Sequence, residues 1–312
     1  MIGKILVVFV GIVLCGGLLV PVIQDEALAG ENTLDIVVLG GQSNAAYTLG
    51  TPRVDPEVTR ENVPLPSTNC YYFGTDSRPV YHSTDLNGCT IHNMVQESQW
   101  HIGGEEAAIA YYLSEKTHDD VLVINVAVPG QSIDKFLPGT QYGDRIVEIL
   151  DLALPMISSH YSEIRCGFVW IQGEADKTTA IADYIADFDI IQGVFSGFGF
   201  DMCYMVQTRP SDSGNATAAQ REIVETHPNV IMASYAPATF SVSSGTLVEG
   251  NEIHYTQKGR DIVGEDLGTA IAAREASHLR EFAGSEIILI IPVIVLLSII
   301  AVVGYGMVSR RS

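Results

Sequence analysis

Residues 34–47 read LDIVVLGGQSNAAY. The first part, 34–39, is almost continuously apolar, a pattern typical of a strand that helices cover on both faces. This run stops at two glycines, and Gln42, Ser43 and Asn44 follow without a break. A turn needs glycine, but it does not need three polar side chains in a row. The stretch therefore indicates either a decorated turn or a serine that is presented for chemistry.

The alternation of apolar runs and polar turns continues along the chain. Strands are predicted at 121–126, 167–171, 201–206 and 230–234, and helices at 104–117, 143–160, 180–191, 215–226 and 257–275. Strands that alternate with helices predict an α/β fold, here a three-layer α/β/α domain with a central parallel sheet. Segment 48–103 reads as a long loop between the first two strands, and loops of this length are usually functional or disordered.

Three polar turns are expected at one edge of this sheet. GGQSNA follows the first strand, AVPGQS the second and QGEAD the third. In open α/β sheets the ligand site lies beyond the carboxyl ends of the strands. Because each of these turns contains glycine and polar side chains, together they predict a site.

A serine hydroxyl becomes a nucleophile only when a neighbouring base takes its proton. His254, in GNEIHYTQKG, is the histidine that the final loop returns to the same edge, just before the last predicted helix. Taken singly, Ser43 reads as a turn residue or helix N-cap, and His254 as a residue at a helix start. The joint pattern favours a catalytic pair.

Four short motifs carry a family resemblance. GQSN, PGQS, WIQGEAD and IHYTQKG together resemble the SGNH hydrolase superfamily, and more narrowly the sialate O-acetylesterase domain group and carbohydrate esterase family six. IGGEEAAIAYYLSE is also similar to the first long helix of that group. The resemblance covers about 34–268. It implies a flavodoxin-like fold and a serine esterase that removes acetyl groups from sugars without a metal or other cofactor.

The resemblance also implies roles for individual residues. Ser43 would be the nucleophile and His254 the general base. The backbone N–H groups of Ser43 and Gly130, with the side chain of Gln172, would form the oxyanion hole, where one donor lowers the barrier by about 3 kcal/mol. Glu174 would orient Gln172 or the Ser43 loop. The remaining supporting residues are Gln42, Asn44 and Asn251.

One position departs from the superfamily pattern, which has an aspartate three residues before the histidine. Here that position is Asn251. An amide stabilises an imidazolium poorly, and an Asp-to-Asn change in a triad can cost about 10⁴ in turnover. Glu252 is therefore our candidate for the third member. The alternatives are a Ser-His dyad supported by a backbone carbonyl, or a site that has lost most of its activity.

Both ends of the chain are set apart from the fold. Residues 1–29 hold one Lys, an apolar run and an A-x-A-like site, which predicts a secretory signal peptide or an N-terminal anchor. Segment 287–308 is uncharged and long enough for a bilayer core of about 30 Å, so it is predicted to be a transmembrane helix. A buried core helix is the alternative, but this segment lacks the expected polar stripe.

The charges near these ends predict a topology. Arg310 and Arg311 follow the apolar segment and Lys4 precedes the first apolar run, which assigns both flanks to the cytoplasm. We therefore expect a single-pass cell-membrane protein. Its esterase domain at 30–275 would be extracytoplasmic, with a tether at 276–286 and a cytoplasmic tail at 309–312.

The net charge of −20 argues against a nucleic-acid partner. The expected partners are a carbohydrate acetyl ester and, through the last apolar segment, the membrane. Cys70 and Cys89 flank a loop-rich stretch and could form a disulfide in an oxidising compartment. Cys166 and Cys203 lie in or beside predicted strands and are expected to be buried thiols. The cysteines show no metal-ligand spacing, so no metal site is predicted.

Segments 48–103 and 131–145 are expected to line the substrate site. Aromatic residues there and beside them could stack on sugar rings or serve as hydrophobic anchors, for example Tyr47, Tyr71, Tyr72, Trp100 and Tyr142.

Three functions compete on the sequence alone. A membrane-anchored carbohydrate O-acetylesterase is favoured. A catalytically weak glycan-binding or surface protein would explain Asn251. An esterase of lipid or peptide esters is disfavoured because the turns are polar and no long apolar lid lies near Ser43.

Overall fold

The computed structural model describes residues 33–46, 69–75, 78–80, 85–94 and 105–276. The chain divides between Glu31 and Asn32 into two units, and all of the described residues belong to the second unit. The predicted signal, the tether beyond residue 276, the apolar segment 287–308 and the tail lie outside the described residues. Within the described ranges, no helix is long and apolar enough to cross a membrane.

An eight-stranded sheet organises the described part of the chain, in the order β3-β2-β5-β1-β6-β7-β8, with β4 paired to β2. From β2 to β8 the neighbouring strands are parallel, whereas β3 and β4 are antiparallel to β2. The strands are β1 Thr33–Gly41, β2 Cys70–Thr75, β3 Arg78–Pro79, β4 Thr90–Asn93, β5 Asp120–Asn125, β6 Glu163–Ile171, β7 Met202–Val206 and β8 Val230–Ser234.

Helices follow the strands. The α-helices are α2 Glu106–Thr117, α3 Gln141–Ala153, α4 Ile181–Gly197, α5 Pro210–Ser213, α6 Asn215–Thr226 and a helix over 257–276. Short 3-10 helices are η2 Ile133–Phe136, η3 Leu154–Met156, η4 Glu174–Asp176 and η5 Ala236–Thr239. A separate antiparallel pair is formed by β9 Leu247–Val248 and β10 Asn251–Tyr255.

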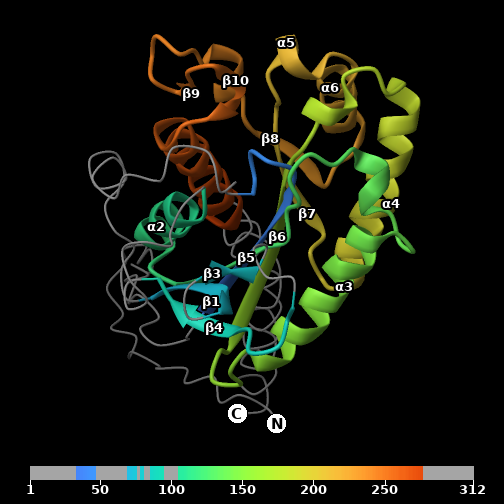
Figure 1. The fold of residues 1–312 in the computed structure, drawn as a ribbon. Helices are drawn as coiled ribbons and strands as arrows, with labels where there is room; N and C mark the ends of the chain where they lie inside the picture. Colours follow the sequence, from blue (N-terminus) through green and yellow to red (C-terminus); the bar gives the residue numbers. More distant parts are fainter. Residues whose placement is uncertain (1–32, 47–68, 76–77, 81–84, 95–104, 277–312) are drawn as a thin grey trace, which may run out of the picture. The chain divides into compact units, whose positions relative to one another are not determined.

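Two hydrophobic cores sandwich the sheet, because alternate residues of each strand point to opposite faces. Ile36 and Val38 of β1 pack with α3, α4 and α6, whereas Val37 and Leu39 pack with α2 and the 257–276 helix. Figure 1 shows these two groups of helices on opposite sides of the strands. The predicted α/β architecture with a mostly parallel sheet is confirmed.

Several segments differ from the sequence prediction; among them, β6 begins at Glu163 rather than 167, and α4 extends to Gly197 rather than 191. Segment 48–103 is not only a loop, since β2, β3 and β4 extend the sheet beyond β5. The helix predicted over 143–160 ends at Ala153, because Pro155 cannot continue an α-helix and the chain turns into η3. The histidine loop contains β10, which no apolar pattern indicates.

The disulfide considered between Cys70 and Cys89 is not formed: the structure does not bond the two thiols to each other. Cys70 lies in β2, where its thiol is 3.5 Å from the backbone oxygen of Ala110 and 3.5 Å from the hydroxyl of Ser114 in α2. Cys70 is thus a packed residue of the interior. Cys203 is buried as expected, and Cys166 is partly exposed.

β1 lies at the centre of the sheet, between β5 and β6. After β1 the chain continues to one side of it, and from β6 onward to the other side, which makes the carboxyl end of β1 a switch point for ligand binding. Gly41 ends β1 with φ +130°, and a Cβ there would lie 2.0 Å from the backbone oxygen of Ile171. Only glycine allows β1 and β6 to approach this closely at the point where the polar turn begins.

Candidate active site

The turn after β1 has a fixed backbone. The carbonyl oxygen of Gln42 accepts hydrogen bonds from the N–H groups of Ala45 at 2.9 Å and Ala46 at 2.8 Å, and the Gln42 N–H donates to Ile171. Because a trans peptide is planar, the N–H of Ser43 points opposite to the Gln42 carbonyl, away from this turn. Ser43 is 5% exposed.

Asn44 joins this turn to the histidine loop. Its side-chain nitrogen donates to the carbonyl oxygen of Ile253 at 3.0 Å, and its side-chain oxygen accepts from the N–H of Tyr255 at 3.1 Å. These two residues flank His254, and Asn44 itself follows Ser43. The structure thus binds the residue after Ser43 to the residues on either side of His254, although 211 positions separate Asn44 from Tyr255 in the chain.

Glu174 buttresses the same asparagine. Its Oε1 accepts from the side-chain nitrogen of Asn44 at 2.6 Å. Its other oxygen is buried and has no hydrogen-bond partner among the described residues. Burial raises the pKa of Glu174 to about 7, and the Asn44 hydrogen bond opposes that rise. The carboxyl therefore contacts the Ser43 turn through Asn44, one of the two orientations expected for it.

His254 is partly buried in β10. Burial, and then the positive charge of Arg260, lowers the pKa of His254, which favours the neutral imidazole. Its Nδ1 is buried and makes no hydrogen bond within the described residues. Asn251 is exposed, and the side chain of Glu252 lies outside the described part. The third member of the triad therefore stays a prediction.

Gly130 follows β5 in the turn that was expected to supply an oxyanion donor. It has φ +71°, and a Cβ at this position would meet no atom within 4 Å. Conformation rather than crowding therefore favours glycine here, and the space beside it is open.

Gln172 is fully buried at the end of β6. Its side-chain nitrogen donates to the backbone oxygen of Gln131 at 3.2 Å, to the side-chain oxygen of Gln42 at 3.3 Å and to Asp176. Two hydrogens thus already serve three acceptors. For Gln172 to donate to a substrate oxygen, one of these bonds would have to be exchanged. Its oxyanion role stays a prediction.

Sequence reasoning missed the role of Asp176, although WIQGEAD contains it. This aspartate is 1% exposed. It accepts from the N–H of Ile133 at 2.9 Å, from the hydroxyl of Thr179 at 2.8 Å and from Gln172. Asp176 therefore ties the turn after β6 to the turn after β5. The sequence feature that could have indicated this role is a second acidic residue two positions after Glu174.

Four polar residues behind the Ser43 turn were also missed. Asn125, at the end of β5, donates to the carbonyl oxygen of Ala45 at 2.9 Å and to Glu106. Arg260 donates to the carbonyl oxygens of Asn44 and Ser43, and it lies beside the buried Glu105. The adjacent acids in IGGEEAA and the arginine in YTQKGR look like surface residues, because charged residues are rarely fully buried.

Among the aromatic residues proposed for sugar stacking, Tyr72 and Tyr142 are packed against their neighbours in the described part of the chain. Tyr72 is 4% exposed, and its hydroxyl donates to the backbone of Thr75. Tyr142 packs against Phe136 on the edge of a core. Tyr47 and Trp100 lie outside the described residues.

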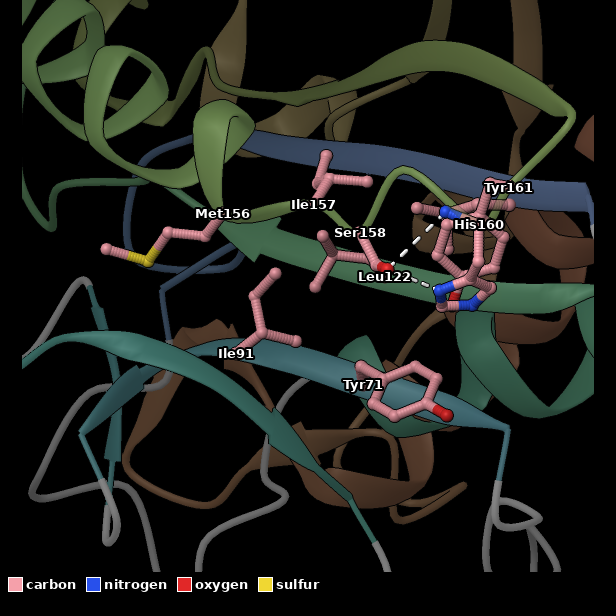
Figure 2. Close-up of a pocket in the computed structure, with 9 residues that line it drawn as sticks. Tyr71, Ile91, Leu122, Met156, Ile157, Ser158, His160 and Tyr161 are labelled. Atoms are coloured by element: carbon pink, nitrogen blue, oxygen red, sulfur yellow. Dashed lines mark hydrogen bonds between the residues drawn. The ribbon is translucent and has the colours of Figure 1, made fainter.

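Tyr71 lines a cavity of about 220 Å³ with Leu34, Ile91, Leu122, Met156, Ile157, Ser158, His160 and Tyr161. Figure 2 shows Tyr71 and Ile91 facing Ile157 and Ser158 across it. Leu34 and Leu122 stand near the amino ends of β1 and β5, so this cavity lies at the edge of the sheet opposite the Ser43 turn. The cavity is mainly apolar and is separate from the candidate active site.

Within the described residues, no group of three or more His, Cys, Asp or Glu side chains could hold a metal ion. The site combines a serine in a turn, a histidine whose flanking backbone is bonded to the residue after that serine, Asn44, and backbone and amide N–H donors. Acyl transfer through a serine requires groups of these kinds.

Solved structures share the fold. A protein from Arabidopsis thaliana superposes with a TM-score of 0.52 at 17% identity, covering 76% of this chain and 96% of that one. A carbohydrate acetylesterase from Xanthomonas citri gives 0.50 at 16% identity, covering 77% and 55%. The structure of NanS gives 0.50 at 15% identity, covering 79% and 99%. At these identities the likeness shows the fold alone.

The sequence itself assigns the family. No curated protein matches the chain. The family described as carbohydrate esterase, sialic acid-specific acetylesterase matches residues 33–273. This span includes the Ser43 turn, both neighbouring turns and β10. The protein therefore belongs to the carbohydrate esterase, sialic acid-specific acetylesterase family and is a carboxylic ester hydrolase.

Proposed function

We propose that this protein removes O-acetyl groups from carbohydrates through an acetyl-enzyme formed on Ser43, with His254 as the base. The observation that carries the proposal is the Asn44 clamp. One side chain bonds the backbone on both sides of His254 and belongs to the residue after Ser43. A turn that served only as a connection would have no need of this tie.

The first half of the reaction transfers the acetyl group to the enzyme. The Ser43 Oγ attacks the carbonyl carbon while its proton passes to Nε2 of His254, since Nδ1 is the buried nitrogen. The N–H groups of Ser43 and Gly130 stabilise the oxyanion, with Gln172 if one of its bonds is exchanged. The intermediate then collapses: the bond to the sugar oxygen breaks, and that oxygen takes the proton from His254.

The second half releases acetate. Water attacks the acetyl carbon and gives its proton to His254, and the bond to Ser43 Oγ breaks as that oxygen regains a proton. A histidine of lowered pKa is neutral at neutral pH, which is the form both attacks require.

The substrate class follows from the family. An acetylated sialic acid or an O-acetylated plant or microbial polysaccharide fits a site whose turns are polar. We further propose that Glu252 or a backbone carbonyl orients His254, because Asn251 cannot replace the missing aspartate.

Hydrolysis of p-nitrophenyl acetate by the full-length protein tests the proposal. We expect activity in the wild type and a loss of at least about 10³-fold in Ser43→Ala, because the nucleophile is removed. Equal rates would contradict the mechanism. An inactive wild type that still binds acetylated glycans would favour the second candidate, a glycan-binding protein, which Asn251 supports. A panel of O-acetylated sialic acid, acetyl-xylan and longer acyl esters then identifies the substrate.

We also propose that the protein is anchored in the cell membrane by 287–308, with the esterase domain outside the cytoplasm. The uncharged segment and the flanking Arg310 and Arg311 support this. The anchored protein should resist extraction by alkaline carbonate and dissolve in detergent. Release into the carbonate supernatant would contradict the anchor.

A further inference from the structure

A buried guanidinium lies behind the Ser43 turn. Arg260 is 1% exposed, and its Nη1 donates to the carbonyl oxygen of Asn44 at 2.7 Å. Its Nη2 donates to the carbonyl oxygen of Ser43 at 3.4 Å. Glu105, which is fully buried, places Oε2 at 3.5 Å from Nη1. Burying a charge costs several kcal/mol unless it is paired and hydrogen-bonded, so the bonds to the turn and to Glu105 are what allow Arg260 to lie here.

These bonds fix the direction of catalytic groups. Each peptide is planar, so holding the carbonyl oxygens of Ser43 and Asn44 sets the orientation of both peptides and of the Cα atoms beside them. The hydroxyl of Ser43 and the amide of Asn44 extend from those Cα atoms. A guanidinium can hold two oxygens at once, whereas a lysine ammonium is a single point on a flexible stem.

We propose that Arg260, held by Glu105, is a positioning residue of the esterase: it fixes the backbone of Ser43 and Asn44 from the buried side, so that the nucleophile and the clamp on the histidine loop keep their productive directions. The inference rests on the proposed function and goes beyond it by assigning the two buried residues a role in turnover.

The charge of Arg260 gives a separate signal. It is the second cause, after burial, that lowers the pKa of His254. The other titratable groups around the turn are Glu105, Glu106, Glu174, Asp212 and Asp261, together with Glu252, whose side chain lies outside the described part. Loss of the positive charge should raise the pKa of His254. The acid limb of kcat/KM requires the neutral base, so this limb should move to higher pH.

The test measures kcat, KM and the acid limb with p-nitrophenyl acetate, using the full-length protein. Arg260→Lys keeps the charge but cannot hold both oxygens. We expect its kcat to fall about 100-fold, as a small misplacement of reacting groups does, with KM and the acid limb little changed. Arg260→Met should lose as much kcat and also shift the limb to higher pH.

A second pair of variants, at Glu105, tests the same role in case the Arg260 variants do not fold. Glu105→Gln keeps the shape and one acceptor for Arg260, so it should retain most of kcat. Glu105→Ala, which removes the acceptor, should lose kcat as Arg260→Lys does. The matched control is Arg165→Lys. Arg165 is a partly buried arginine paired with Asp35 at 2.8 Å, at the opposite edge of the sheet. Its loss should lower Tm without changing kcat or the acid limb.

The outcomes separate the two proposals. An active wild type with unchanged kcat in Arg260→Lys, or with equal kcat in Glu105→Gln and Glu105→Ala, overturns the positioning role alone. An inactive wild type overturns the proposed function, and the positioning role with it. A kcat that falls only in proportion to the fraction of folded protein also overturns the positioning role, because it is then merely structural.

Discussion

Asn44 has no part in the proton and acyl transfers proposed above, yet its side chain makes three hydrogen bonds to two distant segments. Asn44→Ala removes all three bonds and leaves the histidine loop without this tie. We expect kcat/KM to fall about 100-fold through misplacement of His254, with a smaller effect on KM. Steady-state kinetics with p-nitrophenyl acetate measures both.

The control is Asn69→Ala, which also removes a side-chain bond to a distant backbone, from Asn69 to the carbonyl oxygen of Asp119 at 2.7 Å. Asp119 directly precedes β5, at the far edge of the sheet, so stability should fall while kcat/KM stays unchanged. Similar kinetic losses in the two variants would mean that Asn44 acts through general stability.

The buried carboxyl of Glu174 should make the stability of the fold depend on pH. Burial raises its pKa from the usual 4.5 to about 7, so the folded protein binds a proton more tightly than the unfolded chain does. The contribution is fully present below pH 4.5 and is lost as the pH rises through about 7, so Tm should fall across this interval. Glu174→Gln, which keeps an acceptor for Asn44, should have a shallower decline.

Thermal unfolding at a series of pH values compares the two proteins. Burial also raises the pKa of Glu106, Asp35 and Asp261 to about 7 and the pKa of Glu105 to about 8. Because these carboxyls remain in Glu174→Gln, its Tm should still fall as the pH rises, with a smaller slope. Identical slopes would show that the carboxyl of Glu174 does not titrate differently in the folded state.

At the scale of elements, the contact between α2 and the 257–276 helix places Arg260 beside Glu105. Gly264 makes this contact close: a Cβ there would lie 2.5 Å from the Cβ of Ala108 and 2.9 Å from the carbonyl oxygen of Glu105. Gly264→Ala should destabilise the fold by about 1–3 kcal/mol through overpacking and should also lower kcat. Urea unfolding and p-nitrophenyl acetate turnover measure the two effects.

Gly193 of α4 is the matched control, because a Cβ there meets no atom within 4 Å. Gly193→Ala should stabilise the protein by about 0.5–1 kcal/mol, since alanine favours a helix over glycine, and it should leave kcat unchanged. Stabilisation by both substitutions would indicate that the two helices can separate without cost.

Individual helices and strands differ in how well the sequence predicted them. β8 and α6 match their predicted ranges because apolar period and turn residues bound them on both sides. β2 was missed because CYYFGT lies in a polar segment, and a strand that joins a sheet through a distant partner carries no local signal. The histidine loop was located through His254 alone, and its pairing in β10 depends on β9.

At the scale of the whole molecule, the sequence predicted the α/β class, the parallel sheet and the family, since these depend on alternation and on short motifs. It did not predict the buried polar layer beneath the turn. Glu105, Glu106, Asn125 and Arg260 come from three segments of the chain, and their burial follows only once α2, β5 and the last helix meet. The residue type alone does not distinguish a charged side chain in solvent from one in a buried network.

Arg165 joins the two limits of the described domain, because it contacts Asp35 near the start of β1 and Glu275 near the end of the 257–276 helix. Both limits therefore lie at the sheet edge that faces away from Ser43. We therefore expect a solid support or a fused carrier attached next to residue 33 or residue 276 to lie away from the proposed catalytic turn after β1.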